Sequence, residues 1–215
     1  MKYKVIASSS KGNCSIINDQ IMIDIGLPYS RIKEHIKEVK LVLLTHIHSD
    51  HFKRRTIEKL SNEHPTVKFV CLEYLASELS QIVRKENIYV LEVNKKYNVG
   101  IAKIAAFPLV HDVTNCGWRI EMNNEKCIYA TDTSSLDGVV AKNYDLYLIE
   151  GNYDEKEIIE NINKKKETGE FIYEYRAINT HLSKQQREGW LLENIGPKSE
   201  TVLMHEHVEK CDSQE

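Results

Sequence analysis

The chain has 215 residues, of which 41% are hydrophobic and 28% are charged, and its formal net charge at pH 7 is −3. This length allows one domain with a sizeable core, so we expect residues 1–215 to form a single domain of an ordinary globular protein. The slightly acidic balance argues against a broad nucleic-acid-binding surface.

Membrane association and a disulfide framework are also not expected. No stretch is long and apolar enough to cross a membrane, and the N-terminal residues read as a strand rather than as a signal peptide. The five cysteines are scattered and contain no Cys-x-x-Cys pair. Such a set is typical of reduced thiols, so we expect a cytoplasmic protein.

Hydrophobic periodicity predicts the elements of the first half of the chain. A strand over residues 2–7 is followed by a loop rich in turn residues over 8–13. Apolar residues at helical spacing predict helices over 28–38, 53–60 and 74–85. Further strands are expected over residues 14–17, 20–25, 41–44 and 67–72.

The second half repeats this theme. Helices are predicted over 155–163 and 184–193, and the charged residues 164–170 indicate an exposed loop. Strands are predicted over residues 88–93, 101–107, 117–122, 127–130, 145–149 and 201–204. Strands interspersed with helices in both halves suit an α/β fold, a four-layer αββα sandwich with two sheets at its centre.

Residues 45–51, Thr45-His46-Ile47-His48-Ser49-Asp50-His51, are the most informative segment. Three of the nine histidines and one aspartate fall directly after an apolar strand, where α/β folds usually place their chemistry. Imidazole nitrogens and carboxylate oxygens suit borderline divalent metals such as zinc. A metal site is therefore the leading interpretation, and a histidine-rich polar turn is the alternative.

The spacing His-x-His-x-Asp-His resembles the signature of the metallo-β-lactamase fold superfamily. The resemblance implies further ligands later in the chain, and His111, Asp132 and His205 each stand at the end of a predicted strand. His207, two residues beyond the last strand, is the competitor of His205.

The resemblance implies two divalent metal ions, zinc or alternatively manganese. His46, His48 and His111 would bind one ion, while Asp50, His51 and His205 would bind the other and Asp132 would bridge both. The resemblance also implies that Asp24 braces the loop of residues 45–51, which we call the metal loop. A turn or capping aspartate is the alternative.

Other segments are similar to one bacterial and phage subgroup that includes YycJ-like exonucleases. They are residues 8–13, 23–26, 111–118, 131–133, 150–154 and 180–183. In ribonuclease Z relatives, a comparable glutamate and histidine work as a pair. The resemblance implies that His181 is the general acid, that Glu150 orients it, and that Asp50 belongs to the catalytic set as well as to the ligands. A helix-capping histidine beside a structural glutamate is the alternative, and Gly151 and Tyr153 depart from the subgroup's usual Ala and His.

We therefore expect a binuclear metal-dependent phosphodiesterase. We see no insertion long enough for a substrate-gripping arm, which favours a small nucleotide over a long polyanion. In its expected function the chain resembles phage anti-Pycsar proteins, which open cyclic mononucleotides and work as homodimers. This resemblance implies a cyclic nucleotide substrate and a homodimer. The alternatives are a DNA or RNA nuclease of the YycJ or ribonuclease Z type, a thioester or lactone hydrolase, and a noncatalytic metal-dependent binding module.

Overall fold

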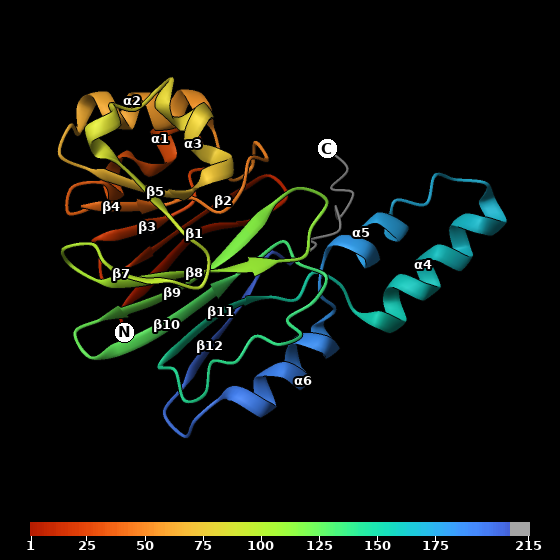
Figure 1. Ribbon diagram of the computed structural model, residues 1–215. Coiled ribbons are helices and arrows are strands. Elements are labelled where there is room, and N and C mark those ends of the chain that lie inside the picture. The colour runs from red at the N-terminus through yellow and green to blue at the C-terminus, as the bar shows by residue number, and fades with distance from the viewer. Residues whose placement is uncertain (207–215) are drawn as a thin grey trace.

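Two six-stranded sheets face each other in the computed structural model, which describes residues 1–206 (Figure 1). Both sheets are mixed, because each contains parallel and antiparallel neighbours. The first sheet consists, in spatial order, of β1 (Tyr3–Ser9), β2 (Gly12–Ile17), β3 (Ile21–Ile23), β4 (Leu41–Leu43), β5 (Lys68–Leu72) and β6 (Ile88–Leu91). The second consists of β12 (Glu200–Met204), β11 (Leu146–Glu150), β10 (Glu125–Ala130), β9 (Asn115–Met122), β8 (Lys103–Leu109) and β7 (Lys96–Asn98).

Helices cover the outer face of each sheet. On the first sheet lie α1 (Tyr29–Ile32), α2 (Arg54–Glu63) and α3 (Glu73–Ser80), and α6 (Lys184–Asn194) lies against β11 of the second (Figure 1). The expected αββα sandwich is therefore confirmed. Among residues 1–206, no helix has the length and apolar character needed to cross a membrane.

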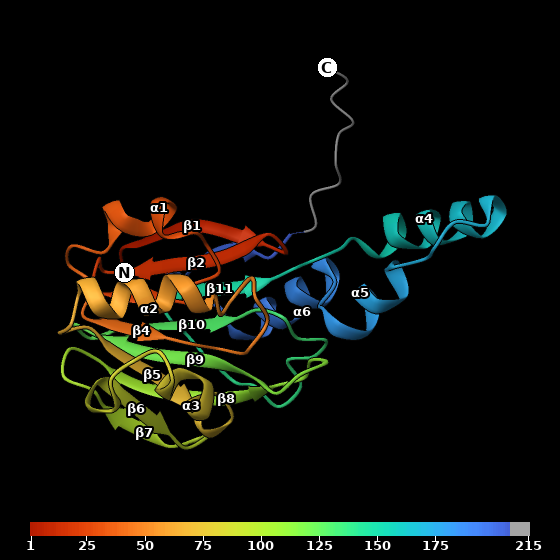
Figure 2. The same ribbon diagram turned by 90° about the horizontal axis from the view of Figure 1, so that it is seen from above.

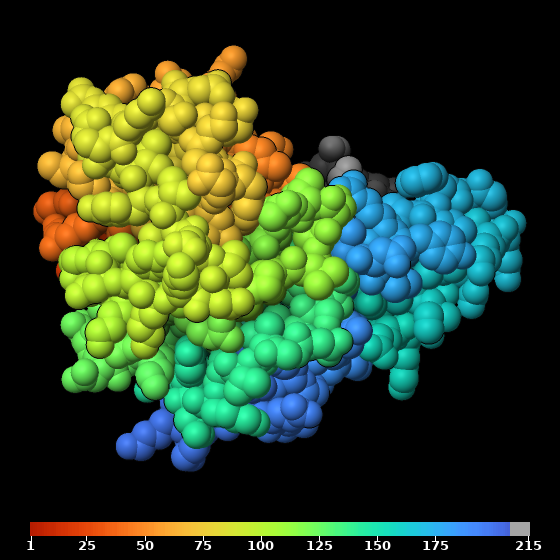
Figure 3. All heavy atoms as spheres, in the orientation of Figure 1, coloured from red at the N-terminus to blue at the C-terminus, as the bar shows by residue number. Residues whose placement is uncertain are grey.

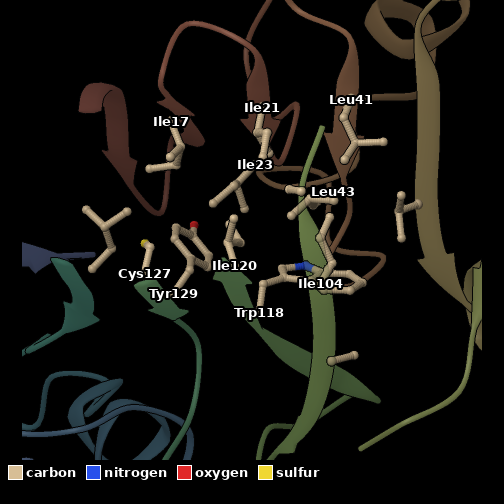
Figure 4. Close-up of a cluster of buried hydrophobic side chains, with 14 of the residues drawn as sticks. Ile17, Ile21, Ile23, Leu41, Leu43, Ile104, Trp118, Ile120, Cys127 and Tyr129 are labelled. Carbon is tan, nitrogen blue, oxygen red and sulfur yellow. The ribbon is translucent and has the colours of Figure 1, made fainter. Parts of the chain in front are cut away.

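The side chains between the two sheets form the central core. Ile21 and Ile23 of β3 share it with Trp118 and Ile120 of β9 (Figure 4). Met22, between the two isoleucines, instead packs beneath the outer helices. Because successive side chains of a strand point to opposite faces, both faces of β3 are buried, as its uninterrupted apolar sequence favours.

Two helices stand off this sandwich. They are α4 (Glu155–Thr168) and α5 (Glu174–Thr180), which form a lobe beyond the ends of the sheets (Figures 2 and 3). Asp154 caps α4 by accepting hydrogen bonds from two backbone amides, and Gly169 ends it with a left-handed backbone. The expected loop over 164–170 is helical up to Thr168, so that expectation is wrong for residues 164–168. The chain also has a projecting lobe, which the expectation of no long substrate-gripping arm did not foresee.

Two shorter segments also differ from the expectation. The predicted loop over 8–13 is a tight turn, because β1 continues to Ser9 and pairs with β2 up to Gly12. The predicted helix over 28–38 is one turn of α1 followed by the 3-10 helix η1 (Lys33–His35). A second 3-10 helix, η2 (Lys85–Asn87), precedes β6. In the segment over 28–38 the local pattern identified the buried apolar residues, such as Ile32 and Ile36, but not the backbone that carries them.

Trp118 should be the most costly single truncation of the central core. Its side chain is fully buried between the sheets, so Trp118→Ala should lower the free energy of unfolding by about 3–5 kcal/mol. Leu192→Ala, at a position that is 78% exposed, is the control and should change it by less than about 0.5 kcal/mol. Urea unfolding checks both, and equal effects would contradict this account of the core.

Candidate metal centre

The candidate ligands gather where strands of both sheets end. In the first sheet, Asp24 follows β3, and the loop that contains His46 follows β4. In the second sheet, β10, β11 and β12 are parallel neighbours, and Asp132, Glu150 and His205 stand at or just beyond their carboxyl ends. The two sheets thus each contribute one half of the site, at the edge where α/β folds usually bind ligands.

Three of these residues have a left-handed backbone. The φ angles are 59° at Asp24, 59° at Asp132 and 51° at His205. Residues other than glycine adopt this conformation rarely, and aspartate and histidine do so more readily than most. Such backbone strain clusters at functional sites. Here each such residue stands just past a strand and turns its side chain toward the same small volume.

The first cluster consists of three imidazoles. Nδ1 of His48 lies 3.1 Å from Nε2 of His46 and 3.4 Å from Nε2 of His111. Zinc–nitrogen bonds of 2.0–2.1 Å in tetrahedral geometry separate two ligand atoms by roughly 3.3 Å. The three nitrogens therefore stand at the spacing that one tetrahedral ion requires.

The second cluster consists of Asp50, His51 and His205. Oδ2 of Asp50 lies 3.5 Å from Nε2 of His51 and 3.9 Å from Nε2 of His205. In each cluster, one ligand atom per residue lies within 4.8 Å of the others, so a single metal ion could contact all three. These are the two groups that the sequence resemblance implied.

Asp132 lies between the clusters. Its Oδ2 is 2.9 Å from Nε2 of His51, and its Oδ1 is 3.5 Å from Nε2 of His205. Oδ1 also lies 3.9 Å from Nε2 of His111, which belongs to the first cluster. The carboxylate therefore faces both groups, as a bridging ligand must.

Two buried polar atoms of this centre make no hydrogen bond of normal geometry and face other candidate ligands instead. They are Oδ2 of Asp132 and Nε2 of His205, on side chains that are both almost completely buried. Buried polar atoms are nearly always satisfied, and an unpaired one points to an ion or water. The orphaned oxygen and nitrogen, in a set of imidazoles and carboxylates, fit divalent metal ions.

Charge and burial compete at these side chains. Burial lowers the pKa of His46, which favours the neutral imidazole that a metal requires. Burial also opposes protonation of His51, but the carboxylates of Asp132 and Asp24 outweigh it and raise its pKa. Burial would raise the pKa of Asp132, yet the neighbouring His51 and His205 hold it well below its ordinary value. The carboxylates of this centre therefore attract positive charge, either as protons on the imidazoles or as metal ions.

Asp24 braces the metal loop, as the resemblance implied. Its Oδ2 lies 2.7 Å from Nδ1 of His51, and its Oδ1 accepts a hydrogen bond from the backbone amide of Thr45. A carboxylate on the second nitrogen of a ligating histidine fixes the ring and its tautomer. Asp24 is completely buried, and its contacts reach from the end of β3 to the metal loop, which favours the bracing role over that of a turn or capping aspartate.

Three asparagines support the site, and the sequence analysis gave none of them a role. The Asn13 amide contacts Nε2 of His51 and Oδ2 of Asp50. Asn115 holds the turn at Asp132 through two carbonyl oxygens, and Asn152 donates to the carbonyl of His205. Asparagines are common in turns, so only contacts between distant segments distinguish these three.

Gly26 allows the metal loop to approach β2. A Cβ at this position would lie 1.7 Å from the backbone oxygen of Asp50. That oxygen accepts a hydrogen bond from the backbone amide of Asn13, and the amide of Gly26 donates to the carbonyl of Asn13. A glycine is therefore required here by close backbone contact.

Glu150 and His181 form a pair beside the clusters. Oε2 of Glu150 lies 3.0 Å from Nδ1 of His181, and its Oε1 accepts hydrogen bonds from the backbone amides of Thr133 and Leu182. Glu150 is completely buried, whereas His181 lines the cavity. His181 also forms a possible ligand group with Asp132 and His205, which makes a metal-binding role its competing interpretation.

A cavity of about 330 Å³ opens over these residues. One side is lined by His48, Asp50 and His111. Another is lined by one face of α5 and the residue that precedes it, namely Tyr173, Arg176, Ala177 and Thr180. The volume is in the range of pockets that hold small ligands. His207, the predicted competitor of His205, lies outside the described residues.

The family described as "Beta-lactamase superfamily domain" matches residues 22–205. The chain belongs to this superfamily. The match spans the strand before Asp24 through His205, and therefore all of the candidate ligands. Comparison with the curated proteins gave no match.

Solved structures show the same fold at low sequence identity. The metallo-β-lactamase fold protein YhfI from Bacillus subtilis is 16% identical, with a TM-score of 0.74, and the match covers 98% of this chain and 88% of that one. The short form of human tRNase Z is 14% identical, with a TM-score of 0.68, and the match covers 96% of this chain and 92% of that one. A diphosphatase of the PhnP family is 16% identical, with a TM-score of 0.64, and the match covers 95% of this chain and 85% of that one. These structures confirm the predicted fold class.

Replacement of Asp132 should affect both ions at once. Asp132→Ala removes the carboxylate that faces both clusters, so we expect the purified variant to hold fewer than two metal ions per chain. Asp137→Ala, an exposed neighbour on the same loop, should keep the metal content of the unaltered protein. Elemental analysis after dialysis measures both, and two ions retained at unchanged affinity in Asp132→Ala would refute the bridge.

Proposed function

We propose that this protein is a binuclear metal-dependent hydrolase that cleaves phosphodiester bonds. The ligands would be His46, His48 and His111 for one ion and Asp50, His51 and His205 for the other, with Asp132 shared. The observation that carries the proposal is the Glu150–His181 pair on the cavity wall beside both clusters. Divalent ions held by these residues would supply Lewis acidity and an activated water at neutral pH.

His181 would donate a proton to the leaving oxygen. An alkoxide leaving group needs a proton in the transition state, and histidine can provide it near neutral pH. Nδ1 of His181 is held by Glu150, so the opposite nitrogen of the ring remains for the substrate. Glu150 is itself fixed by two backbone amides, and it would therefore orient the acid rather than act on the substrate.

Two of the structural neighbours are named for cleavage of phosphate linkages, a tRNase Z and a diphosphatase. This supports phosphate chemistry over hydrolysis of a thioester or lactone. A thioester in addition has a thiolate leaving group, which has less need of a proton donor. Zinc suits the imidazole-rich ligand set, and manganese is the alternative.

A small cyclic nucleotide is the proposed substrate, and a nucleic acid is the alternative. The projecting lobe removes the argument that the chain lacks an arm. However, α4 carries four lysines and four glutamates, and α5 carries one arginine and one glutamate. A lobe without net charge does not provide the electrostatic attraction on which polyanion binding depends. The cavity of about 330 Å³ supports a mononucleotide-sized ligand.

A hydrolysis panel tests the activity and the substrate class together. The purified protein, loaded with zinc or manganese, should open cyclic mononucleotides faster than it cleaves single- or double-stranded DNA, RNA or bis(p-nitrophenyl) phosphate. Faster cleavage of DNA or RNA would favour the nuclease. Hydrolysis of thioesters or lactones without any phosphodiester cleavage would refute the proposal.

His181→Ala should separate the general acid from the ligands. We expect it to keep two metal ions and to lose phosphodiesterase activity by about 10²- to 10⁴-fold, the usual contribution of general acid catalysis. His64→Ala, at the end of α2 and outside the site, is the matched control. Full activity with unchanged metal content would exclude the assigned role, whereas loss of a metal ion would identify His181 as a ligand.

The lobe supports the proposal of a homodimer. Apolar side chains are exposed on it, with Phe171 at 87%, Ile159 at 56% and Tyr175 at 47%. If these side chains form one continuous patch, that patch would mark an interaction surface. Two copies could cover these side chains by packing lobe against lobe or lobe against sandwich.

Phe171→Ser should therefore shift the protein from dimer toward monomer, because it removes the most exposed aromatic ring of the lobe. Light scattering coupled to gel filtration measures the mass in solution. Leu192→Ser, exposed on α6 instead, should leave the dimer intact. A monomeric unaltered protein, or a dimer unaffected by Phe171→Ser, would contradict assembly through the lobe.

A further inference from the structure

Helix α5 is anchored to the metal centre at its carboxyl end. The carbonyl oxygen of Thr180, its last residue, lies 3.1 Å from Nδ1 of His111. His181 follows directly, and its amide donates to the carbonyl of Ala177. The side of α5 that carries Arg176 and Ala177 lines the cavity. Side chains on this face are therefore held at a fixed position relative to both the ligands and the proposed acid.

Arg176 is the only lysine or arginine among the described residues that line the cavity. Three carboxylates, those of Asp50, Asp132 and Glu206, line it as well. Bound divalent ions would offset the charges of Asp50 and Asp132 on the ligand side of the cavity. The guanidinium of Arg176 adds a positive charge with directed N–H donors on the α5 wall.

Arg176 is held toward the first cluster by Asp112. Its Nη2 donates a hydrogen bond of 2.6 Å to Oδ2 of Asp112. The other oxygen of Asp112 lies 3.1 Å from Nε2 of His111 and 3.4 Å from Nε2 of His48. The guanidinium is thus connected to two candidate ligands through a single carboxylate.

The ion pair leaves Arg176 able to bind a ligand. Its side chain is 72% exposed, and a guanidinium has five N–H donors, of which this hydrogen bond uses one. Exposed ion pairs contribute little stability, so a competing anion could share or replace Asp112 at small cost. The planar arrangement of the donors matches two oxygens of a phosphate.

We propose that Arg176 binds the anionic phosphate of the substrate from the α5 wall and thereby selects phosphodiesters over neutral esters. This inference rests on the proposed phosphodiesterase function and adds a specificity-determining residue to it. The contact would exist in the bound substrate as well as in the transition state. Loss of Arg176 should therefore raise KM more than it lowers kcat.

The test compares Arg176→Ala and Arg176→Lys in the metal-loaded protein. The substrate is the phosphodiester cleaved fastest by the unaltered protein, and binding of inorganic phosphate is measured separately by calorimetry. Arg176→Ala should raise KM and the Kd of phosphate by about 10- to 100-fold, the loss expected for a hydrogen bond to a charged group. Arg176→Lys keeps the charge without the planar donors, so its KM and phosphate Kd should lie between those of the unaltered protein and those of Arg176→Ala. Arg55→Ala, exposed on α2, is the matched control and should change neither constant.

Two outcomes would overturn the inference. One is an unchanged KM and phosphate Kd in Arg176→Ala, and the other is a reduced metal content, which would show that Arg176 acts through Asp112 on the ligands. If the unaltered protein cleaves no phosphodiester, the proposed function fails. The comparison of phosphate binding between the unaltered protein and Arg176→Ala then decides whether Arg176 forms an anion site. Weaker phosphate binding by Arg176→Ala would then still support an anion site at α5, and equal binding would exclude it.

Discussion

The carboxylate of Asp132 is the interaction on which the rest of the site depends. It is buried, it carries its charge among imidazoles of both clusters, and its Oδ2 faces Nε2 of His51 without a hydrogen bond of normal geometry. A buried charge is costly unless it is paired, so the surrounding groups must be arranged to meet it. The left-handed backbone at Asp132 and the hydrogen bonds from Asn115 to this turn hold the carboxylate in place.

The central core has a consequence for the same carboxylate. His46, Asp50 and His51 follow the first sheet, whereas His111, Asp132 and His205 follow strands of the second. The separation of the two half-sites therefore depends on the side chains between the sheets, including Trp118 and Ile23 (Figure 4). Close packing in this layer resists compression. The spacing of the ligands is thus a property of the whole sandwich rather than of the loops alone.

Much of the fold could be predicted from the sequence, for identifiable reasons. The apolar runs at 41–44 and 146–149 are buried on both faces, so composition alone marked them as strands. The histidines of residues 46–51 are close in sequence, which made the first half of the site visible. Its second half could be predicted only from strand ends and the family resemblance.

The parts that escaped prediction depend on contacts between distant segments. Asn13 and Asn115 stand at the starts of β2 and β9, and Asn152 follows β11, so nothing marks them as site residues until tertiary structure brings them to the ligands. Helix α5 has only seven residues, too few for a clear periodicity, and its position depends on the contact between Thr180 and His111. Helix α4 contains a run of three lysines, which by itself is equally typical of a loop.

Helix α5 has two faces with different surroundings. Arg176, Ala177 and Thr180 line the cavity, whereas Tyr175 and Ile178, on the opposite side by helical spacing, are exposed apolar residues. Anything that packs on the outer face therefore presses on an element whose end is bonded to His111 and continues into His181. The position of the proposed proton donor and the occupancy of the outer surface are mechanically coupled. Substitutions that adapt this surface to a new neighbour would also alter the reactive geometry, so the two properties cannot diverge independently during evolution.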